Sequence, residues 1–340
     1  MKKEKIKIAF FEIDEEWEKE FLEKHLKKRN FELFFSEKTL TLREARKIKD
    51  FQIVSPFVYS KISKKILERL PKLKFISTRS TGFDHIDLEE CRKRKIKVSN
   101  VPSYGENTVA EHTFALILAL SRKLCPCCAK AKECFCPGPE LTGFDLKGKT
   151  LGVVGTGRIG MNVIRIAKGF GMRVLAYDIK PQKKMEKRLG FRYVSFEEVL
   201  SKSDIITLHV PLNRSTYHMI NEKTFKLFKK GSYLINTARG AVVDTRALIK
   251  ALDEGILAGA GLDVLEGEKF LREERELLSK RFPRKTLEVL LENHILMKYP
   301  NVIITPHNAF NSKEALLRIL ETTVKNIFSF VKGKPINLVK

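Results

Sequence analysis

Three glycines at a fixed spacing are the first residues that could do chemistry. Gly155, Gly157 and Gly160 stand in TLGVVGTGRIG with G-x-G-x-x-G spacing. Such glycines allow a tight turn and a close approach of the backbone to a pyrophosphate, which the amides of a following helix can bind. The pattern alone is weak, but here it follows an apolar run and opens an amphipathic one, as a dinucleotide site requires. A glycine turn in an ordinary strand–helix unit is the alternative interpretation.

An acid at the end of the next apolar run strengthens the dinucleotide interpretation. Asp178 closes RVLAYD, about 20 residues after the glycines, where a carboxylate accepts hydrogen bonds from the adenosine ribose. Its charge repels a 2′-phosphate, so the sequence favours NAD over NADP. Lys180 lies close by and could weaken this preference, although a solvated surface lysine is the simpler interpretation.

Four polar residues near the ends of three later apolar runs form a second group. Arg239 follows SYLINTA, Asp263 and Glu268 follow the next run, and His307 follows NVIITP. Ligands bind at the carboxyl ends of strands in open α/β sheets, and arginine offers a planar fork for a carboxylate. A single histidine after a strand is more often structural than catalytic. Together with an arginine and two acids, His307 becomes a candidate acid/base residue.

The apolar runs predict the strands that must position these residues. Short β-type runs alternate with charged helical runs, which indicates parallel α/β architecture. The later runs are apolar throughout, as is typical of strands covered on both faces. We therefore predict an α/β fold with doubly wound parallel sheets. The expected strands are residues 6–13, 31–36, 51–55, 74–80 and 96–100, followed by 147–154, 173–178, 204–210, 232–238, 259–265 and 301–306.

Two further stretches predict particular helices. Residues 101–124 are apolar nearly all round, so we expect a helix buried between layers. Residues 312–334 carry apolar side chains at helical spacing, with Ser312 as N-cap and a stop near Gly333. The sequence does not indicate where this last helix docks.

Length, composition and charge exclude several classes. With 340 residues and 43% hydrophobic residues, the chain is expected to fold as a globular protein of two domains. The apolar runs are too short for a membrane span and the N-terminus reads as a strand, so we expect a cytoplasmic location. The net charge of +24 could attract nucleic acid. Because lysine and arginine alternate with glutamate and no nucleic-acid motif is found, neither nucleic acid nor membrane is an expected partner.

The chain resembles the D-isomer-specific 2-hydroxyacid dehydrogenase family over nearly its whole length. Within that family it is most similar to D-lactate dehydrogenases, because the segment between Glu268 and His307 is long and Phe310 follows the histidine by three residues. The matching motifs are TRSTGFDHID, VPSYGENTVAEHTFALILAL, LGVVGTGRIG with AYD, LHVPL, INTARGAVVDTRAL, GLDVLEGE and TPHNAF.

The resemblance implies two Rossmann-like or flavodoxin-like domains with a cleft between them. Residues 1–100 and 311–340 form the substrate domain, and residues 101–310 form the NAD-binding domain. It also implies a homodimer, with the helix after VPSYG at the contacts between domains and between subunits.

The resemblance further implies a role for each candidate residue. Arg239 binds the substrate carboxylate and polarises the 2-oxo group, His307 is the general acid/base, and Glu268 holds the imidazole and stabilises its charged form. NADH delivers a hydride to C2 of a 2-oxo acid such as pyruvate. The implied cofactor contacts are Gly155, Gly157, Arg158, Ile159, Gly160, Asp178, Val210, Pro211, Thr237, Ala238 and Asp263. The implied substrate contacts are Ser80, Thr81, Gly82, Tyr104, Arg239 and Phe310.

Three functions remain open. We favour a D-lactate dehydrogenase. A reductase of glyoxylate, hydroxypyruvate or a phosphorylated hydroxy acid is the second reading. The third is an NAD-sensing binding protein, because the fold also serves as a transcriptional corepressor scaffold. The set of Arg239, Glu268 and His307 argues for catalysis, although the corepressor resemblance keeps these residues too.

A cysteine-rich segment departs from the family, which has a cysteine-poor helix and loop there. Reduced thiols without function are favoured over a disulfide or a bound Zn²⁺ or iron–sulfur centre, because the C-x-C and C-C spacings are tighter than those of zinc sites. No metal is predicted. Pro126 and Pro137 should disturb any helix. His85 and His112 are read as structural, hydrogen-bonded residues. The clustered cysteines are Cys125, Cys127, Cys128, Cys134 and Cys136.

Overall fold

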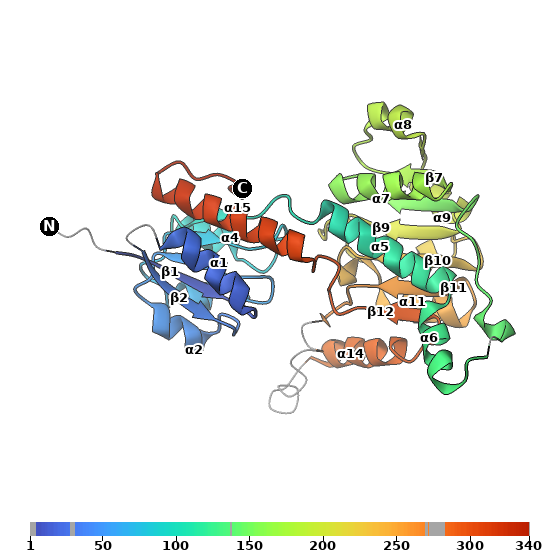
Figure 1. The fold of residues 1–340 in the computed structure, drawn as a ribbon, viewed down its shortest axis with the longest axis horizontal. Coiled ribbons are helices and arrows are strands. Elements are labelled where there is room, and N and C mark those ends of the chain that lie inside the picture. Colours follow the sequence, from blue (N-terminus) through green and yellow to red (C-terminus); the bar gives the residue numbers. More distant parts are fainter. Residues whose placement is uncertain (1–4, 28–30, 137, 269–270, 272–282, 340) are drawn as a thin grey trace. The chain divides into compact units, whose positions relative to one another are not determined.

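The structure is a computed structural model that describes residues 5–27, 31–136, 138–268, 271 and 283–339 (Figure 1). The chain divides into two compact units, Met1–Tyr104 with Ser312–Lys340, and Gly105–Asn311. Each unit contains one parallel β-sheet with helices around it. The predicted fold class of two doubly wound parallel sheets is confirmed.

The first unit has five parallel strands in the order β2-β1-β3-β4-β5, which is the flavodoxin-like order. All five strands fall within predicted runs, but β3, β4 and β5 are only three residues long. The strands are β1 (Ile6–Phe11), β2 (Phe31–Ser36), β3 (Ile53–Ser55), β4 (Phe75–Ser77) and β5 (Lys97–Ser99). The helices are α1 (Glu16–Leu26), α2 (Leu42–Ala45), α3 (Lys64–Leu67), α4 (Leu88–Lys93) and α15 (Lys313–Val331).

The docking of α15 completes this unit. Ile8 and Phe10 of β1 point to one face of the sheet, where they pack with α1 and with Leu320 of α15. Ala9 and Phe11 of the same strand point to the opposite face, where a separate core includes residues of α2, α3 and α4. The helix begins as predicted, with the Ser312 hydroxyl accepting a hydrogen bond from the Ala315 amide at 3.2 Å.

The second unit has seven parallel strands in the order β12-β11-β10-β9-β6-β7-β8. The strand order reverses direction between β6 and β9, and such a switch point is where open α/β sheets bind dinucleotides. The strands are β6 (Thr150–Val154), β7 (Arg173–Tyr177), β8 (Arg192–Tyr193), β9 (Ile205–Leu208), β10 (Ser232–Asn236), β11 (Leu257–Leu262) and β12 (Val302–Ile304).

The helices of the second unit surround this sheet (Figure 1). Its two faces are covered by separate apolar cores, one with α9 and α11 and one with α5 and α7. The helices are α5 (Glu106–Ser121), α6 (Leu124–Glu133), α7 (Arg158–Gly169), α8 (Lys183–Leu189), α9 (Phe196–Lys202), α10 (Glu222–Phe225), α11 (Thr245–Asp253) and α14 (Arg284–Leu296). The two-residue strand β8 was not predicted, because two residues are too few to show a period.

Helix α5 departs from the prediction of burial between layers. It packs against α7, β10 and β11, and this side buries Phe114, Leu116 and Ile117. Glu111 and Ala115 are exposed. The prediction is therefore correct only for the side facing α7 and the sheet, since an apolar composition all round does not decide which side meets a partner.

The cysteine segment also corrects two expectations. Pro126 lies inside α6 without breaking it, because it is the third residue of the helix, where the amide has no partner within the helix. Pro137 lies outside the described residues. Cys134 and Cys136 form a disulfide, so the favoured reading as reduced thiols is wrong for this pair. The remaining three cysteines of the segment are free thiols. No cluster of metal-ligating side chains is found in the described part of the chain.

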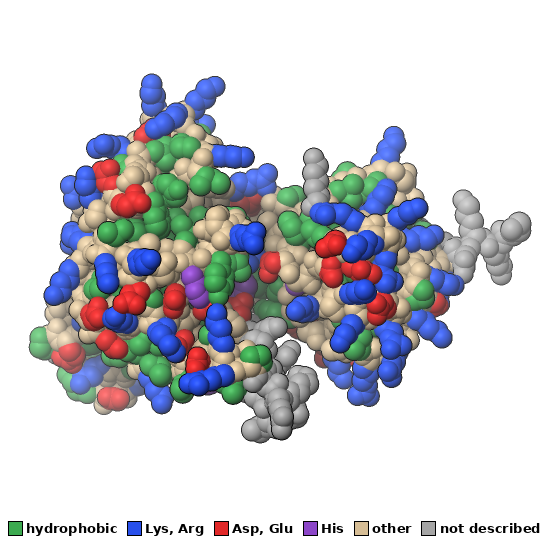
Figure 2. Space-filling view, turned by 180° about the vertical axis from the view of Figure 1, so that it is seen from behind, with side chains coloured by type: hydrophobic (Ala, Val, Ile, Leu, Met, Phe, Trp, Pro, Cys, Tyr) green, Lys and Arg blue, Asp and Glu red, His purple; other side chains and the backbone are tan. Residues whose placement is uncertain are grey.

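On the face seen in Figure 2, the positive charge is spread over the surface rather than gathered in one stripe. In the view of Figure 2, lysine and arginine side chains are distributed over each unit, with acidic side chains between them. Several form ion pairs one helical turn apart, such as Lys202 with Glu198 at 2.6 Å. None of the helices in the described ranges has the length and hydrophobicity needed to span a bilayer.

Candidate active site

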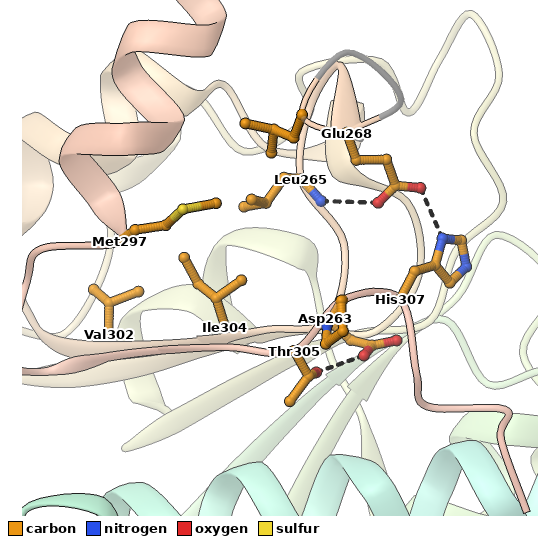
Figure 3. Close-up of a pocket in the computed structure, with 10 residues that line it drawn as sticks. Asp263, Leu265, Glu268, Met297, Val302, Ile304, Thr305 and His307 are labelled. Atoms are coloured by element: carbon orange, nitrogen blue, oxygen red, sulfur yellow. Dashed lines mark hydrogen bonds and ion pairs between the residues drawn. The ribbon is translucent and has the colours of Figure 1, made fainter. Parts of the chain in front are cut away.

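His307 and Glu268 form the centre of the candidate site. His307 Nδ1 lies 2.7 Å from Oε1 of Glu268 (Figure 3). The second carboxylate oxygen, Oε2, accepts a hydrogen bond from the Leu265 amide at 3.3 Å. Because an ionised carboxylate only accepts, Nδ1 carries the proton of this hydrogen bond. Nε2 is therefore the ring nitrogen that could take up or release a proton.

Asp263, at the end of β11, holds the turn that carries His307. Its Oδ1 accepts hydrogen bonds from Thr305 Oγ1 at 2.5 Å and from the Asn308 amide at 2.8 Å, and its Oδ2 accepts one from the Ala309 amide at 2.9 Å. His307 has a φ of 53°, a left-handed conformation that costs a non-glycine residue about 1 kcal/mol or more. The hydrogen bonds to Asp263 offset this cost.

The Asp263 carboxylate is buried, with 1% of the residue exposed. Burial raises the pKa of Asp263, but hydrogen bonds from His112, Thr305 and two backbone amides outweigh burial and hold the pKa below its usual value. His112 Nε2 lies 3.0 Å from Thr305 Oγ1 and 3.4 Å from Asp263 Oδ1. The sequence interpretation of His112 as a hydrogen-bonded structural residue did not anticipate that its partners support the His307 turn.

Replacing Asp263 with asparagine tests this support. We expect Asp263→Asn to lower the free energy of unfolding by about 1–3 kcal/mol at neutral pH, because an amide group cannot accept all the hydrogen bonds of the turn. The folded-state pKa of Asp263 is depressed, so its contribution is present above the unfolded value and is lost as the pH falls through the folded value. In urea unfolding, the difference in free energy of unfolding between Asp263→Asn and wild type should be constant down to about pH 4 and smaller below it.

The matched control for this measurement is Asp145→Asn, which changes an exposed aspartate of the same unit. This variant should unfold like wild type. A destabilisation by Asp263→Asn that disappears well above the ordinary aspartate pKa would contradict the depressed pKa.

The Arg239 loop is tied to the segment that carries Glu268. After β10, the Arg239 Nη1 donates to the Ala238 carbonyl at 2.8 Å, and the Asn236 side chain donates to the Arg239 carbonyl at 3.0 Å. A Cβ at Gly240 would lie 2.0 Å from the carbonyl carbon of Leu265. Glycine at this position therefore allows the backbone after Arg239 to touch the backbone just before Glu268.

A cavity of about 470 Å³ adjoins the His307–Glu268 pair. Figure 3 shows the two polar residues at one side and apolar side chains such as Met297 and Ile304 at the other. The described lining residues are Asp263, Leu265, Glu268, Leu271, Met297, Val302, Ile304, Thr305, Pro306 and His307.

The glycine loop between β6 and α7 has the geometry that a dinucleotide needs. Gly155 has a φ of 93°, and a Cβ there would lie 2.5 Å from the carbonyl oxygen of His209. A Cβ at Gly160 would lie 2.0 Å from the Gly155 carbonyl oxygen. At Gly157, directly before α7, no atom of the described residues other than the glycine and its chain neighbours lies within 4 Å of that position. The loop is therefore closely packed on one side and open where a pyrophosphate would meet the helix amides.

Asp178 lies beside this loop, directly after β7. Its Oδ2 accepts hydrogen bonds from the Thr156 amide at 2.6 Å and the Thr156 hydroxyl at 2.9 Å, and its Oδ1 accepts one from the Lys180 amide at 2.8 Å. The carboxylate is thus held at the end of β7, where the sequence predicted the ribose contact. The supporting Thr156 was not singled out by the sequence pattern, because x in G-x-G accepts many side chains.

The remaining predicted residues of this unit lie on loops at the carboxyl ends of strands or on α7. Val210 and Pro211 come soon after β9, and Ala238 follows β10. The Thr237 hydroxyl lies 3.1 Å from that of Thr113 in α5. The Phe310 ring meets the His307 ring edge-on, with 6.4 Å between centroids. Arg158 and Ile159 begin α7, and Arg158 lies 3.4 Å from Glu106.

The predicted substrate residues Ser80, Thr81, Gly82 and Tyr104 belong to the first unit. Ser80, Thr81 and Gly82 lie in the loop after β4, where the Ser80 hydroxyl donates to the Gly82 carbonyl at 2.6 Å and the Thr81 hydroxyl donates to the Val101 carbonyl at 2.8 Å. The Tyr104 carbonyl accepts a hydrogen bond at 2.6 Å from the Arg318 side chain of α15.

Comparison with known proteins decides the family. The model for "D-isomer specific 2-hydroxyacid dehydrogenase, NAD binding domain" matches residues 114–309, which is more than half of the chain. The chain belongs to this family. Members of the family are NAD-dependent oxidoreductases of 2-hydroxy acids, so the predicted cofactor and enzyme class are confirmed.

Family members with two different names are similar to this chain. The glyoxylate reductase of Thermococcus litoralis is 42% identical over 301 residues, covering 86% of this chain and 85% of that protein. The D-lactate dehydrogenase of Escherichia coli is 35% identical over 333 residues, covering 97% and 98%. The structure of the Aquifex aeolicus D-lactate dehydrogenase, complexed with NAD and lactic acid, has a TM-score of 0.86, 41% identity and 96% coverage of both chains.

Proposed function

We propose that this family member is a D-lactate dehydrogenase that reduces pyruvate to D-lactate. The observation that carries the proposal is the Phe310 ring, 6.4 Å from the imidazole of His307. An apolar ring beside the acid/base residue suits a substrate with a methyl group next to the reacting carbon, as in pyruvate, whereas glyoxylate has only a hydrogen there. The share of this chain that each relative matches also supports a D-lactate dehydrogenase. The E. coli D-lactate dehydrogenase aligns with 97% of this chain, and the T. litoralis glyoxylate reductase aligns with 86%.

Two residues are proposed to act directly on the substrate, and a third acts through one of them. Arg239 binds the carboxylate through its planar guanidinium and fixes which face of the 2-oxo group is presented. His307 donates the proton on Nε2 to the carbonyl oxygen, where negative charge grows as C2 is reduced. Glu268 accepts the hydrogen bond from Nδ1 throughout, and its charge stabilises the imidazolium before the proton leaves. When bound, NADH supplies the hydride that reduces C2.

The proposed cofactor contacts are the glycine loop, Asp178 and the strand-end residues. The glycine loop would bind the pyrophosphate through the amides at the start of α7, and the Asp178 carboxylate would accept a hydrogen bond from a ribose hydroxyl. Asp263, which the resemblance places near the nicotinamide, uses both carboxylate oxygens to hold residues 305–309. We propose that Ser80, Thr81 and Gly82 add backbone contacts to the substrate carboxylate, and that Tyr104 lies near the substrate.

Assembly and location follow from the resemblance. We propose a cytoplasmic homodimer, in which the exposed side of α5 contributes to the subunit contact. The presence of Ala115 on that side supports this, because a small exposed side chain in an otherwise apolar helix allows another helix to approach closely.

A glyoxylate reductase is the second candidate. The observation in its favour is the 42% identity to the Thermococcus litoralis protein, which exceeds the 35% identity to the Escherichia coli D-lactate dehydrogenase.

Substrate preference separates the two candidates. Purified, reduced protein is tested for NADH oxidation with pyruvate, glyoxylate, hydroxypyruvate and longer 2-oxo acids, and the chirality of the product is measured. We expect the highest kcat/KM with pyruvate and the D-isomer as product. Phe310→Ala should lower kcat/KM for pyruvate more than for glyoxylate, by about threefold to tenfold, because a buried methyl contact contributes about 1 kcal/mol.

A higher kcat/KM with glyoxylate than with pyruvate, and equal effects of Phe310→Ala on both, would contradict the D-lactate assignment and favour the reductase. Tight NADH binding without turnover of any of these acids would favour the third reading, an NAD-sensing binding protein.

A further inference from the structure

A chain of hydrogen bonds connects Asp178 to an edge strand that the sequence did not predict. Thr156 Oγ1 lies 2.9 Å from Asp178 Oδ2 and 2.7 Å from the hydroxyl of Tyr193 in β8. The Tyr193 hydroxyl in turn accepts a hydrogen bond from the Gln182 amide at 3.1 Å. The Gln182 side chain returns to the Thr156 carbonyl at 3.1 Å. Thr156 is completely buried.

The donors and acceptors of this chain have one consistent direction. A carboxylate only accepts, so the hydrogen of the Thr156 hydroxyl points to Asp178. The Tyr193 hydroxyl must then donate to Thr156, and its own oxygen accepts from the Gln182 amide. Each member polarises the next, and the chain ends on the anion.

This arrangement restricts the Asp178 carboxylate. Oδ2 receives two hydrogen bonds from Thr156, which satisfy its lone pairs, and Oδ1 receives one from the Lys180 amide. Oδ1 keeps one acceptor position for a ribose hydroxyl. With both oxygens bound to the protein, the carboxylate cannot rotate away without breaking these bonds, so its negative charge stays in place against a 2′-phosphate.

We propose that Tyr193 and Thr156 are positioning residues that hold Asp178 in the orientation needed to select NAD(H) over the 2′-phosphorylated cofactor. They act through Asp178. The charge of Asp178 discriminates against the 2′-phosphorylated cofactor, and the two hydroxyl groups preserve this discrimination. Loss of a hydrogen bond in the chain lets the carboxylate rotate away, so that a 2′-phosphate can bind.

The tyrosine ring is held independently of its hydroxyl group, which makes a clean substitution possible. The ring packs edge-on against Phe191 at 5.0 Å between centroids, and Lys183 lies 5.4 Å over it. The backbone amide of Tyr193 donates to Glu186 at 2.8 Å. Tyr193→Phe therefore removes the hydroxyl while leaving these contacts in place.

Cofactor binding without substrate tests the proposal. Dissociation constants for NADH and NADPH are measured by calorimetry for wild type, Tyr193→Phe, Thr156→Val and Thr156→Ser. We expect the NADPH-to-NADH ratio of dissociation constants to fall by about threefold to tenfold in Tyr193→Phe and Thr156→Val, as expected for loss of one hydrogen bond in the chain. Thr156→Ser keeps a hydroxyl and should retain the wild-type ratio.

Tyr233→Phe is the matched control. Tyr233 lies at the start of β10 and packs on Phe144, so loss of its hydroxyl group should leave the ratio of the two dissociation constants unchanged. A wild-type ratio in both Tyr193→Phe and Thr156→Val would overturn the proposal. This holds even if both affinities fall, because an equal loss of affinity for NADH and NADPH indicates a purely structural role. The readout is cofactor binding, so it does not depend on which 2-oxo acid the enzyme reduces.

Discussion

His307→Asn is expected to lower kcat for pyruvate reduction by about 10²- to 10⁴-fold, the usual contribution of a general acid. Asparagine tolerates the left-handed backbone of this position better than alanine does, so the turn held by Asp263 should persist. The amide of asparagine cannot donate a proton to the substrate oxygen. NADH binding should stay near that of wild type, because the glycine loop and Asp178 are untouched. Steady-state kinetics and NADH titration together measure both effects.

His25→Asn is the control for this prediction. His25 is an exposed histidine of α1 whose ring nitrogen contacts the Phe21 carbonyl at 2.7 Å, and its replacement should leave kcat unchanged. If His307→Asn kept its turnover and instead lost affinity for NADH, His307 would not be the acid/base residue.

Arg239→Lys is the second large effect. We expect kcat/KM for pyruvate to fall by about 10²- to 10³-fold, which corresponds to about 3–4 kcal/mol of transition-state stabilisation. Lysine keeps the positive charge but loses the planar fork that binds both carboxylate oxygens. Initial rates over a range of pyruvate concentrations should show a higher KM together with a lower kcat, because orientation of the 2-oxo group is lost as well as affinity.

Arg246→Lys serves as the matched arginine control. Arg246 lies on the surface of α11, with its Nε 2.9 Å from Glu292, and its replacement should not change kcat/KM. An unchanged KM for pyruvate in Arg239→Lys, with weakened NADH binding, would place Arg239 on the cofactor and not on the substrate.

The sequence by itself determined the features that depend on neighbours along the chain. Alternation of apolar and charged runs predicted the α/β class, because each strand must bury its side chains and each helix one face. The spacing of Gly155, Gly157 and Gly160 after an apolar run predicted a dinucleotide loop, and Asp178 predicted a preference for NAD. The Ser312 cap predicted where α15 begins, since capping involves only the first turn of a helix.

The tertiary structure decided how distant residues meet. Asp263 and the 305–309 turn are brought together by the pairing of β11 with β12. No local sequence pattern indicates that both carboxylate oxygens of Asp263 accept hydrogen bonds from this turn. The contact of Gly240 with the backbone at Leu265 likewise depends on neighbouring strands. Residues 269–270 and 272–282, part of the long segment that points to the D-lactate dehydrogenase branch, lie outside the described residues.

The elements that the sequence predicted wrongly or did not predict have the same physical cause. Burial of α5 on one side, the docking of α15 and the pairing of β8 all depend on which surface lies opposite, and composition does not specify that surface. The chain from Gln182 through Tyr193 and Thr156 to Asp178 joins residues up to 37 positions apart. Hydrogen bonds between such residues form only when strands β6, β7 and β8 lie side by side, so only the folded sheet could show what holds Asp178 in place.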